Sequence, residues 1–273
     1  MTQRILFVGG GNMGAALIGG LIANGEPASA LSAVEIDPAQ RKRLAATYGI
    51  EVVAEIADVA HAVDTIVLAV KPQQMRAAAG ALQPALRSQL VLSIAAGIRT
   101  VDLSRWLGGY RRIVRVMPNT PALVRAGISG LFACAEVSAA ERDRAEAVLR
   151  AVGETLWVER EELIDAVTAV SGSGPAYVFF FIEALRQGAL ELGFDRSQAQ
   201  QLALATFAGA IRLAQTSDED VAILRERVTS KGGTTERALA IMHAEGVATA
   251  IAKAVHGAMQ RAEELGREMG KAP

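Results

Sequence analysis

The sequence has little cysteine, histidine or net charge, and each shortage narrows its interpretation. Only one cysteine, Cys134, occurs in 273 residues, which excludes an internal disulfide framework and a cysteine-rich metal site. We interpret it as a small packing residue rather than a nucleophile. The three histidines, His61, His243 and His256, show no metal-ligand spacing, so no metal is expected. The formal net charge is −1, which gives no electrostatic reason to expect nucleic acid or an anionic membrane as a partner.

The chain also lacks a stretch that is typical of a membrane span or a signal peptide. Its least charged stretch, Ile5–Ala23, contains several glycines and an asparagine, and no basic region with a small-residue cleavage site accompanies it. No other apolar run is expected to be long enough to cross a membrane. Hydrophobic residues make up 51% of the chain, enough for a sizeable core in one large domain or two ordinary ones. We therefore expect a soluble, cytoplasmic protein.

The clearest positive signal lies near the N-terminus. A short apolar strand, Ile5–Val8, runs directly into GGGNMG at Gly9–Gly14, whose glycines fit the spacing G-x-G-x-x-G. An apolar helical stretch follows at Ala15–Ala23, and an acidic residue, Glu35, lies about 20 residues beyond the last glycine. Strand, glycines, helix and acid in this order predict a dinucleotide site. The alternative is a glycine-rich turn without a ligand.

Each glycine of this motif has a separate expected role. Gly9 permits a tight turn, Gly11 lets the backbone approach a pyrophosphate, and Gly14 lets the helix pack close to the strand. The N-terminus of the helix then faces the phosphates with its N–H groups.

The chain divides into two parts by its pattern. In residues 1–160, short β-branched runs alternate with helical stretches, as in a parallel α/β sheet with crossover helices. We predict a Rossmann-like dinucleotide-binding domain there. The expected strands are Arg4–Val8, Leu31–Glu35, Glu51–Val53, Thr65–Val70, Leu90–Ile94, Ile113–Met117, Ser129–Ala133 and Thr155–Val158.

Residues 161–273 show no strand signal and are expected to form an all-α domain. Many of its helices carry small residues on more than one face, and a part of roughly 110 residues seldom buries several faces by itself. We therefore expect a homodimer, or a multiple of dimers, joined through residues after about Arg160; the alternative is one ordinary helical bundle. The expected helices are Ala176–Leu192, Arg196–Thr216, Val221–Val228, Glu236–Glu245 and Val247–Arg267.

Three short motifs stand where predicted strands end: AVKP at Ala69–Pro72, SIAAG at Ser93–Gly97 and MPNTP at Met117–Pro121. The carboxyl ends of strands in an open α/β sheet line the ligand crevice. Lys71 is placed to approach cofactor phosphate or ribose oxygens, and the small side chains of SIAAG leave room for a flat ring. Taken singly, AVKP would be a mere turn, and SIAAG is equally compatible with tight helix–sheet packing. Together they predict one lined cleft.

A fourth motif lies in the helical part, in two pieces. The sequence SGSGPAY at Ser171–Tyr177 is expected to open a helix, with Pro175 in its first turn. The sequence TSKGGTT at Thr229–Thr235 is expected to open another. Glycine amides and threonine hydroxyls at a helix N-terminus form an anion nest that suits a substrate carboxylate. The alternative is plain N-capping, since Ser and Thr prefer that position.

These motifs, in this order and spacing, resemble those of the pyrroline-5-carboxylate reductases, and the resemblance covers essentially the whole chain. It implies a two-domain subunit whose helical domain interlocks with that of a partner, with the substrate site where the two domains meet. The implied reaction is hydride transfer from NADH or NADPH to the C=N bond of 1-pyrroline-5-carboxylate. It gives L-proline and is the last step of proline biosynthesis.

The resemblance also implies roles for individual residues. Thr235 matches the hydroxyl residue that contacts the ring nitrogen and is the one implied catalytic side chain. Gly233 and Thr234 offer amides to the substrate carboxylate. The implied substrate-binding residues are Ser230, Gly232, Gly233, Thr234 and Thr235. The implied cofactor-binding residues are Gly9, Gly10, Gly11, Asn12, Met13, Gly14, Glu35, Ala69, Val70, Lys71, Pro72, Ile94, Ala95, Ala96 and Asn119.

The chain departs from the family pattern at two places. Lys231 stands where the family usually has proline, and it either adds a cation near the substrate carboxylate or points to solvent. Glu35 and Asp37 stand where the family commonly has an Asn-Arg-Ser/Thr type of segment that grips the 2′-phosphate of NADPH. The sequence therefore leans to NADH. The basic run Arg41–Arg43 is the alternative, ranked second because it lies a full turn or more away.

Three other functions compete with this interpretation. A β-hydroxyacid dehydrogenase would carry a catalytic lysine on the helix after the glycine-rich turn, and Tyr177–Phe181 has none. An imine reductase of broader substrate range is harder to separate from the first interpretation. A non-catalytic redox sensor would be favoured by a basic interaction tail, whereas Glu263–Pro273 is short and mixed in charge.

Overall fold

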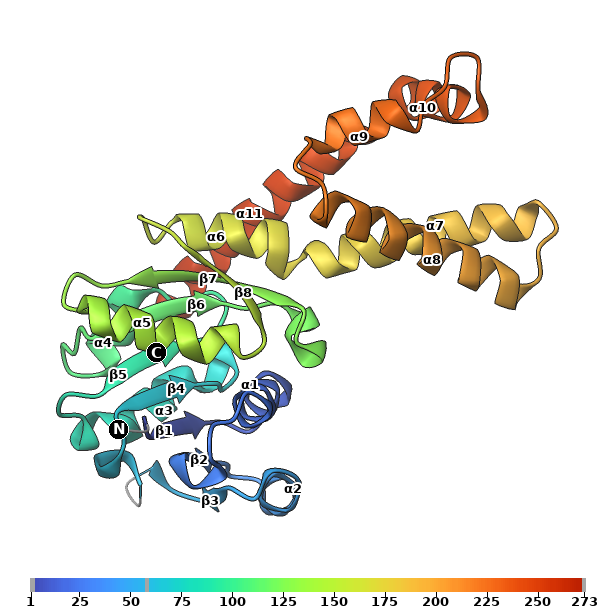
Figure 1. Ribbon diagram of the computed structural model, residues 1–273. Helices are drawn as coiled ribbons and strands as arrows, with labels where there is room; N and C mark the ends of the chain where they lie inside the picture. The colour runs from blue at the N-terminus through green and yellow to red at the C-terminus, as the bar shows by residue number, and fades with distance from the viewer. Residues whose placement is uncertain (1–2, 57–58, 272–273) are drawn as a thin grey trace. The chain divides into compact units, whose positions relative to one another are not determined.

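The computed structural model describes residues 3–56 and 59–271. The chain forms two compact units (Figure 1). The first, unit 1, comprises Met1–Ser173 together with Ala258–Pro273, and the second, unit 2, comprises Gly174–Gly257. The predicted boundary at residue 160 concerns functional domains and stays a prediction.

Unit 1 is built on one sheet with strand order β3-β2-β1-β4-β5-β6-β7-β8. Strand β1 pairs in parallel with β2 on one side and β4 on the other, so Val8 lies between Val34 and Leu68. The strand order reverses between β1 and β4, and the crevice at such a reversal is where ligands bind in open α/β sheets. The strands are β1 Ile5–Val8, β2 Leu31–Val34, β3 Glu51–Val53, β4 Thr65–Leu68, β5 Leu90–Ser93, β6 Ile113–Met117, β7 Gly127–Ala133 and β8 Gly153–Trp157.

All eight expected strands form, but one direction was predicted wrongly. Strand β7 runs antiparallel to β6, with Met117 opposite Gly130, whereas the alternation of strands and helical stretches predicted a parallel sheet. The connection between them contains only a 3₁₀ segment, η6 Thr120–Val124, and a parallel return needs a crossover of a dozen or more residues. The chain therefore turns straight back. Helix α5, Ala139–Arg150, then supplies the crossover that makes β8 parallel to β7.

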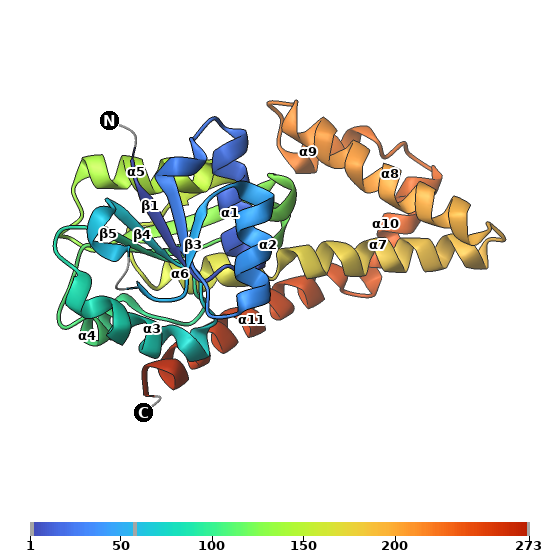
Figure 2. The ribbon, with the colours of Figure 1, turned by 90° about the horizontal axis from the view of Figure 1, so that it is seen from below.

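Helices cover both faces of this sheet (Figure 2). The helices of the sheet layers, besides α5, are α1 Asn12–Ala23, α2 Pro38–Tyr48, α3 Met75–Leu82 and α4 Thr100–Trp106. Successive strand residues alternate between faces: Phe7 packs with α1 and α5 in one apolar core, and Leu6 packs with α3 and α4 in the other. Burying each large apolar side chain of these cores contributes about 1.5–3 kcal/mol. Short 3₁₀ segments lie at η1 Ala28–Ala30, η3 Ala60–Ala62, η4 Pro72–Gln74 and η5 Gln83–Ala85.

A buried ion-pair network joins the sheet to the next helix, α6 Leu163–Val167. Arg115 on β6 is 2% exposed, and its guanidinium lies 2.7 Å from an Asp165 carboxylate oxygen and 3.2 Å from Glu161 Oε1. The Glu161 carboxylate also accepts hydrogen bonds from the Thr100 N–H (2.7 Å) and hydroxyl (2.6 Å) at the start of α4. Arg99 lies 3.9 Å from the second Asp165 oxygen. These contacts fasten the beginning of the helical region to the sheet.

The SGSGPAY motif opens a helix as expected, because α7, Gly174–Glu191, begins inside it with Pro175 in the first turn. A π-helical turn, η7 Thr168–Gly172, which was not predicted, links α7 to α6. The helical run Leu163–Glu191 is therefore 29 residues long. By length and composition it is apolar enough to cross a membrane, which corrects the expectation that no such run exists after Ile5–Ala23. The bent pair α10 Thr234–Ala244 and α11 Val247–Lys271 passes the same test when taken together.

From residue 161 onward, no strand occurs among the described residues, as expected for the all-α part. In unit 2, helix α7 packs against α8, Arg196–Gln215, whose start is fixed by a capping box between Asp195 and Gln198. Helix α9, Val221–Arg227, and helix α10 follow. The last turns of α11 belong to unit 1. There Met269 packs on the apolar core of α3 and α4, and Gly270 lies so close to Asp102 that a Cβ would be 2.4 Å from its Oδ2.

Candidate cofactor and substrate sites

A cavity of about 940 Å³ lies at the carboxyl ends of β1, β2 and β4, in the crevice where the strand order reverses. Its size is typical of sites for small molecules and cofactors. Its described lining includes Gly9, Gly11, Glu35, Ile36, Asp37, Glu55, Ala69, Val70, Lys71, Gln73 and Gln74. One space is thus bordered by Gly9 and Gly11 of the predicted glycine turn (Gly9–Gly11), by Glu35 after β2, and by the first three residues of AVKP. Apolar Ile36 is 74% exposed and gives this space a surface for a flat base.

The glycine turn has the geometry that the motif predicts. Gly9 has φ +103°, and a Cβ there would lie 2.8 Å from the Ala69 carbonyl oxygen. A Cβ on Gly14 would lie 2.6 Å from the Gly9 oxygen, so the close packing of helix on strand needs both glycines. Gly11 borders the cavity, with no atom within 4 Å of its Cβ position, and it is the N-cap of α1. The positive end of the α1 dipole therefore lies at this turn.

Glu35 lies at the rim of the cavity, and its carboxylate is fixed by the backbone. One oxygen accepts a hydrogen bond from the Gly10 N–H at 2.9 Å and the other from the Asp37 N–H at 3.0 Å. Asp37 is itself the N-cap of α2 and accepts from the Ala39 N–H at 2.9 Å. Each Glu35 oxygen keeps a lone pair for a hydroxyl donor such as a ribose.

A third carboxylate, Glu55, lines the same cavity and was not predicted. It follows β3, whose carboxyl end reaches the same sheet edge as that of β2. That strand-end position was the available sequence signal. Among the described lining residues, the cavity therefore has three carboxylates and one cation, Lys71.

Arg41 reaches further back than expected. Its Nη1 donates to the carbonyls of Glu35 (2.8 Å) and Ile36 (2.9 Å). Side chains of a helix lean toward its N-terminus, which brings a residue of the second turn to the preceding loop. The distance from α2 therefore does not exclude Arg41 as a cation at this end of the cavity. Its guanidinium, however, is already held by two backbone carbonyls.

The other predicted cofactor motifs do not line this cavity. Ile94 and Ala95 are buried where β5 ends, beside β4 in the sheet, and Ala96 is half-buried. Asn119 is 8% exposed: its Oδ1 accepts from the Ile128 N–H at 2.9 Å and its Nδ2 donates to the Ser171 carbonyl at 3.1 Å. This amide therefore ties the loop after β6 to β7 and to the π turn. A direct role of these residues at the cofactor stays a prediction.

The predicted substrate residues lie in unit 2 at the start of α10. The N-cap is Gly233, and no side chain caps the helix, so N-capping by the threonine hydroxyls is not the reason for this sequence. The Gly233 N–H donates to the Ser230 carbonyl at 3.0 Å. The Gly232 N–H donates to a carboxylate oxygen of Glu236 at 2.7 Å, a contact that was not predicted. Thr234 is exposed, and Thr235 is half-buried.

Cys134 is poorly suited to act as a nucleophile. Burial raises the pKa of the Cys134 thiol, a hydrogen bond with Thr100 opposes this only partly, and the thiol form of a cysteine is a weak nucleophile. In the residues that the structure describes, no group of three or more His, Cys, Asp and Glu side chains is placed to hold a metal ion.

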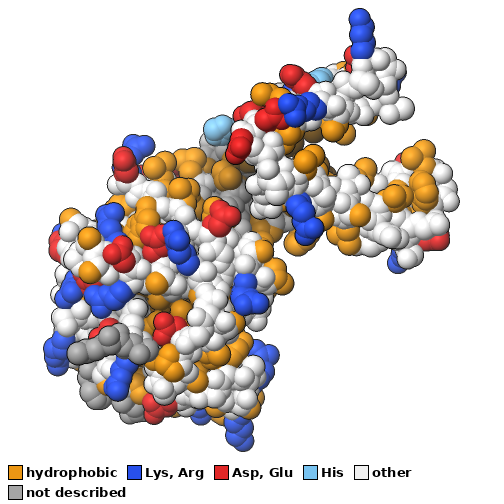
Figure 3. Space-filling model, in the orientation of Figure 1, with side chains coloured by type: hydrophobic (Ala, Val, Ile, Leu, Met, Phe, Trp, Pro, Cys, Tyr) orange, Lys and Arg blue, Asp and Glu red, His pale blue; other side chains and the backbone are white. Residues whose placement is uncertain are grey.

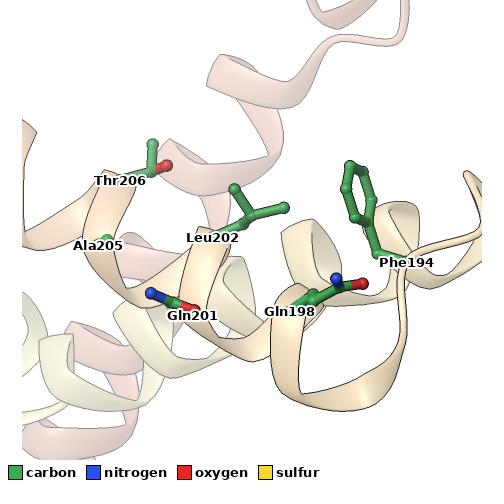
Figure 4. A pocket seen from close by; sticks show the side chains of 6 residues that line it. All are labelled: Phe194, Gln198, Gln201, Leu202, Ala205 and Thr206. Carbon is green, nitrogen blue, oxygen red and sulfur yellow. The ribbon is translucent and has the colours of Figure 1, made fainter.

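The helices of unit 2 expose large apolar side chains (Figure 3). Phe179 and Phe180 on α7 are 66% and 67% exposed. A hollow of about 520 Å³ lies along α8 (Figure 4). Its residues recur at helical spacing on one face, after Phe194 in the preceding turn. They are Phe194, Gln198, Gln201, Leu202, Ala205 and Thr206.

Two family models match this chain, one in each part. Residues 161–265 match the family model described as pyrroline-5-carboxylate reductase dimerisation, and residues 4–97 match that of the coenzyme F420-dependent NADP oxidoreductases. The pyrroline-5-carboxylate reductase of Pseudomonas aeruginosa is 48% identical over 99% of each chain. A solved structure of the Coxiella burnetii enzyme superposes with a TM-score of 0.93 at 39% identity, covering 97% of this chain and 99% of that one.

A further solved structure, that of the Plasmodium falciparum pyrroline carboxylate reductase with NADP bound, has a TM-score of 0.86 at 29% identity. It covers 97% of this chain and 98% of its own. On identity and coverage over the full length, this chain belongs to the pyrroline-5-carboxylate reductase family.

Proposed function

We propose that this chain reduces the C=N bond of 1-pyrroline-5-carboxylate with NADH or NADPH and releases L-proline, the last step of proline biosynthesis. The observation that carries the proposal is the 48% identity over 99% of the chain to a pyrroline-5-carboxylate reductase. The cavity at the glycine turn supports it independently. We further propose that residues 1–160 bind the dinucleotide, that residues 161–273 bind substrate and form the dimer, and that the enzyme works as a soluble protein of the cytoplasm.

In this proposal the bound dihydronicotinamide supplies a hydride, which becomes a C–H bond at the imine carbon while the ring nitrogen ends with a proton. The chain supplies position and charge complementarity. The glycine turn and the α1 N-terminus hold the pyrophosphate, and Glu35 accepts hydrogen bonds from the adenosine ribose. Lys71 lines the same cavity and is proposed to approach the ribose or phosphate oxygens.

The substrate is proposed to bind at the start of α10. The amides of Gly233 and Thr234 receive its carboxylate at the positive end of the helix dipole, with Ser230 and Gly232 completing the turn. The Thr235 hydroxyl orients the ring nitrogen. An imine that arrives protonated needs no strong acid from the protein, so one hydroxyl is sufficient for this role. Glu236 lies close to this turn, and its carboxylate already holds the Gly232 N–H.

The first prediction tests the activity itself. Purified, folded protein mixed with 1-pyrroline-5-carboxylate should oxidise a reduced nicotinamide, followed by its absorbance, and form an equal amount of proline, followed by chromatography. A reaction without substrate is the control. No proline above that control with either NADH or NADPH would rule out the proposed function.

The second prediction concerns Thr235. Thr235→Ala should lower kcat/KM for the substrate about 10- to 150-fold, because a hydrogen bond to a charged group contributes about 1.5–3 kcal/mol. Dissociation constants for the dinucleotide should stay unchanged. Thr235→Ser should retain most activity, and Thr234→Ala, which keeps the backbone amide, is the matched control. Wild-type kinetics in Thr235→Ala would remove Thr235 from the site.

The third prediction concerns assembly. The exposed apolar faces of unit 2 and the dimerisation match over 161–265 support a homodimer or a multiple of dimers. Light scattering at micromolar concentration should give an even multiple of the subunit mass. Leu202→Glu, in the α8 hollow, should weaken assembly, whereas Val101→Glu on α4, also at an exposed apolar side chain, should not. A stable wild-type monomer would contradict the proposal.

The fourth prediction is a preference for NADH. The 2′-phosphate of NADPH would approach Glu35, and Asp37 and Glu55 line the same cavity. Two like charges about 4 Å apart repel by roughly 4 kcal/mol at an effective dielectric constant of 20. We expect kcat/KM to be about tenfold or more higher with NADH at saturating substrate, with a smaller ratio at physiological salt than at low salt.

Two neutral variants test the origin of that preference. Asp37→Asn keeps the N-cap, and Glu55→Gln keeps a side chain of the same size. Each should lower the ratio of kcat/KM with NADH to kcat/KM with NADPH, because it removes a negative charge with little change of shape. Glu51→Gln on β3, exposed and outside the described lining, is the control. A clear preference of the wild type for NADPH at both salt concentrations would show instead that a cation such as Arg41 takes up the phosphate.

A further inference from the structure

The glycine turn is fastened to α2 by side chains that lie outside the glycine motif. The Gly10 N–H donates to Glu35 Oε2 at 2.9 Å, and Gln40 Nε2 donates to the Gly10 carbonyl oxygen at 2.6 Å. Gln40 lies in the first turn of α2 and is half-buried. The two bonds hold the peptide groups on either side of Gly10.

The position of Gly10 makes these bonds specific to glycine. A Cβ on Gly10 would lie 2.2 Å from Leu44 Cδ1, and Leu44 is 1% exposed. The backbone is thus pressed against α2. Leu44 and Gln40 are four residues apart, so they lie on the same face of the helix. The contact with Leu44 therefore brings the Gly10 carbonyl within reach of the Gln40 amide.

The bond from Gln40 also sets the direction of the next N–H group. The carbonyl of Gly10 and the N–H of Gly11 belong to one peptide plane, and the described chain has no cis peptide bond. In a trans peptide the carbonyl and the N–H point in opposite directions. A Gly10 carbonyl held toward Gln40 therefore directs the Gly11 N–H away from α2. Gly11 borders the cavity, and its Cβ position has no atom within 4 Å.

We propose that Gln40 is a positioning residue for the pyrophosphate of the cofactor. It holds the peptide plane whose N–H faces the phosphates, so this donor is oriented before the ligand arrives. Glu35 holds the preceding peptide plane and cannot replace Gln40, because the two planes rotate independently about the Gly10 Cα. The proposal rests on the proposed function, since the ligand is a dinucleotide. Gln40 itself touches no reacting atom.

Two variants of the full-length enzyme test this role. Gln40→Leu removes the amide donor at similar size, and Gln40→Glu places a carboxylate oxygen against the Gly10 carbonyl. Thr47→Val, an exposed polar-to-apolar change on the same helix, is the control. Calorimetry measures the affinity for ADP-ribose, which carries the pyrophosphate, and for adenosine, which lacks it. Steady-state kinetics measure KM for each cofactor, and thermal melting checks that each variant is folded.

Gln40→Leu should lower the affinity for ADP-ribose about 3- to 10-fold, which is the effect of losing one neutral hydrogen bond. The affinity for adenosine should stay unchanged. KM for NADH and NADPH should rise by the same factor, with kcat and KM for the substrate unchanged. Gln40→Glu should lower the affinity for ADP-ribose further, and Thr47→Val should leave it unchanged. Unchanged ADP-ribose affinity in both Gln40 variants, or an equal loss for adenosine, would overturn this role alone. No binding of ADP-ribose by the wild-type enzyme would overturn the proposed function together with it.

Discussion

The constraint on which the site depends is the position of β1 between two parallel neighbours. Because β2 and β4 both run alongside it, the chain can leave β1 only by turning sharply at its carboxyl end, over the edge of the sheet. Gly9 makes that turn against the Ala69 carbonyl, and α1 then begins at the sheet edge. The same geometry creates the cavity and points the positive end of α1 at it. Fold and phosphate site therefore follow from one turn.

A second constraint is the burial of the Arg115 guanidinium within the sheet. A guanidinium buried in a sheet must be paired, and removing one partner from such a pair costs about 3–5 kcal/mol. Its two carboxylate partners come from Glu161 and from Asp165 on α6. Glu161 also holds the start of α4. The network thus fixes where the helical region leaves the sheet and connects that point to the segment after SIAAG. It accounts for a charged residue within a strand that is otherwise apolar.

The sequence predicted what local patterns encode. Short β-branched and apolar runs predicted all eight strands, and the glycine spacing placed Gly9 and Gly14 correctly. Strand direction is not contained in such a run, so the antiparallel β7 was missed. The helix beginning at SGSGPAY was predicted from Pro175 in the first turn, but the π turn that joins this helix to α6 was not. The contacts of Gln40 and Arg115 join residues 30 or more apart, and no local pattern encodes such pairs.

The two units differ in how they achieve burial, and this links folding to assembly. Unit 1 has two apolar cores, one on each face of its sheet. In α7, α9 and α10, all of whose residues the structure describes, no side chain is buried, and α8 buries only Ala199 and Ala203. The little apolar surface that these helices bury within the subunit does not offset the conformational entropy lost when they are ordered. The match of residues 161–265 to the model described as pyrroline-5-carboxylate reductase dimerisation supports oligomerisation through this part of the chain. Under the proposed assembly, a second subunit would cover these faces and account for the apolar length of Leu163–Glu191, and the residues proposed to bind substrate would lie on helices stabilised by that contact.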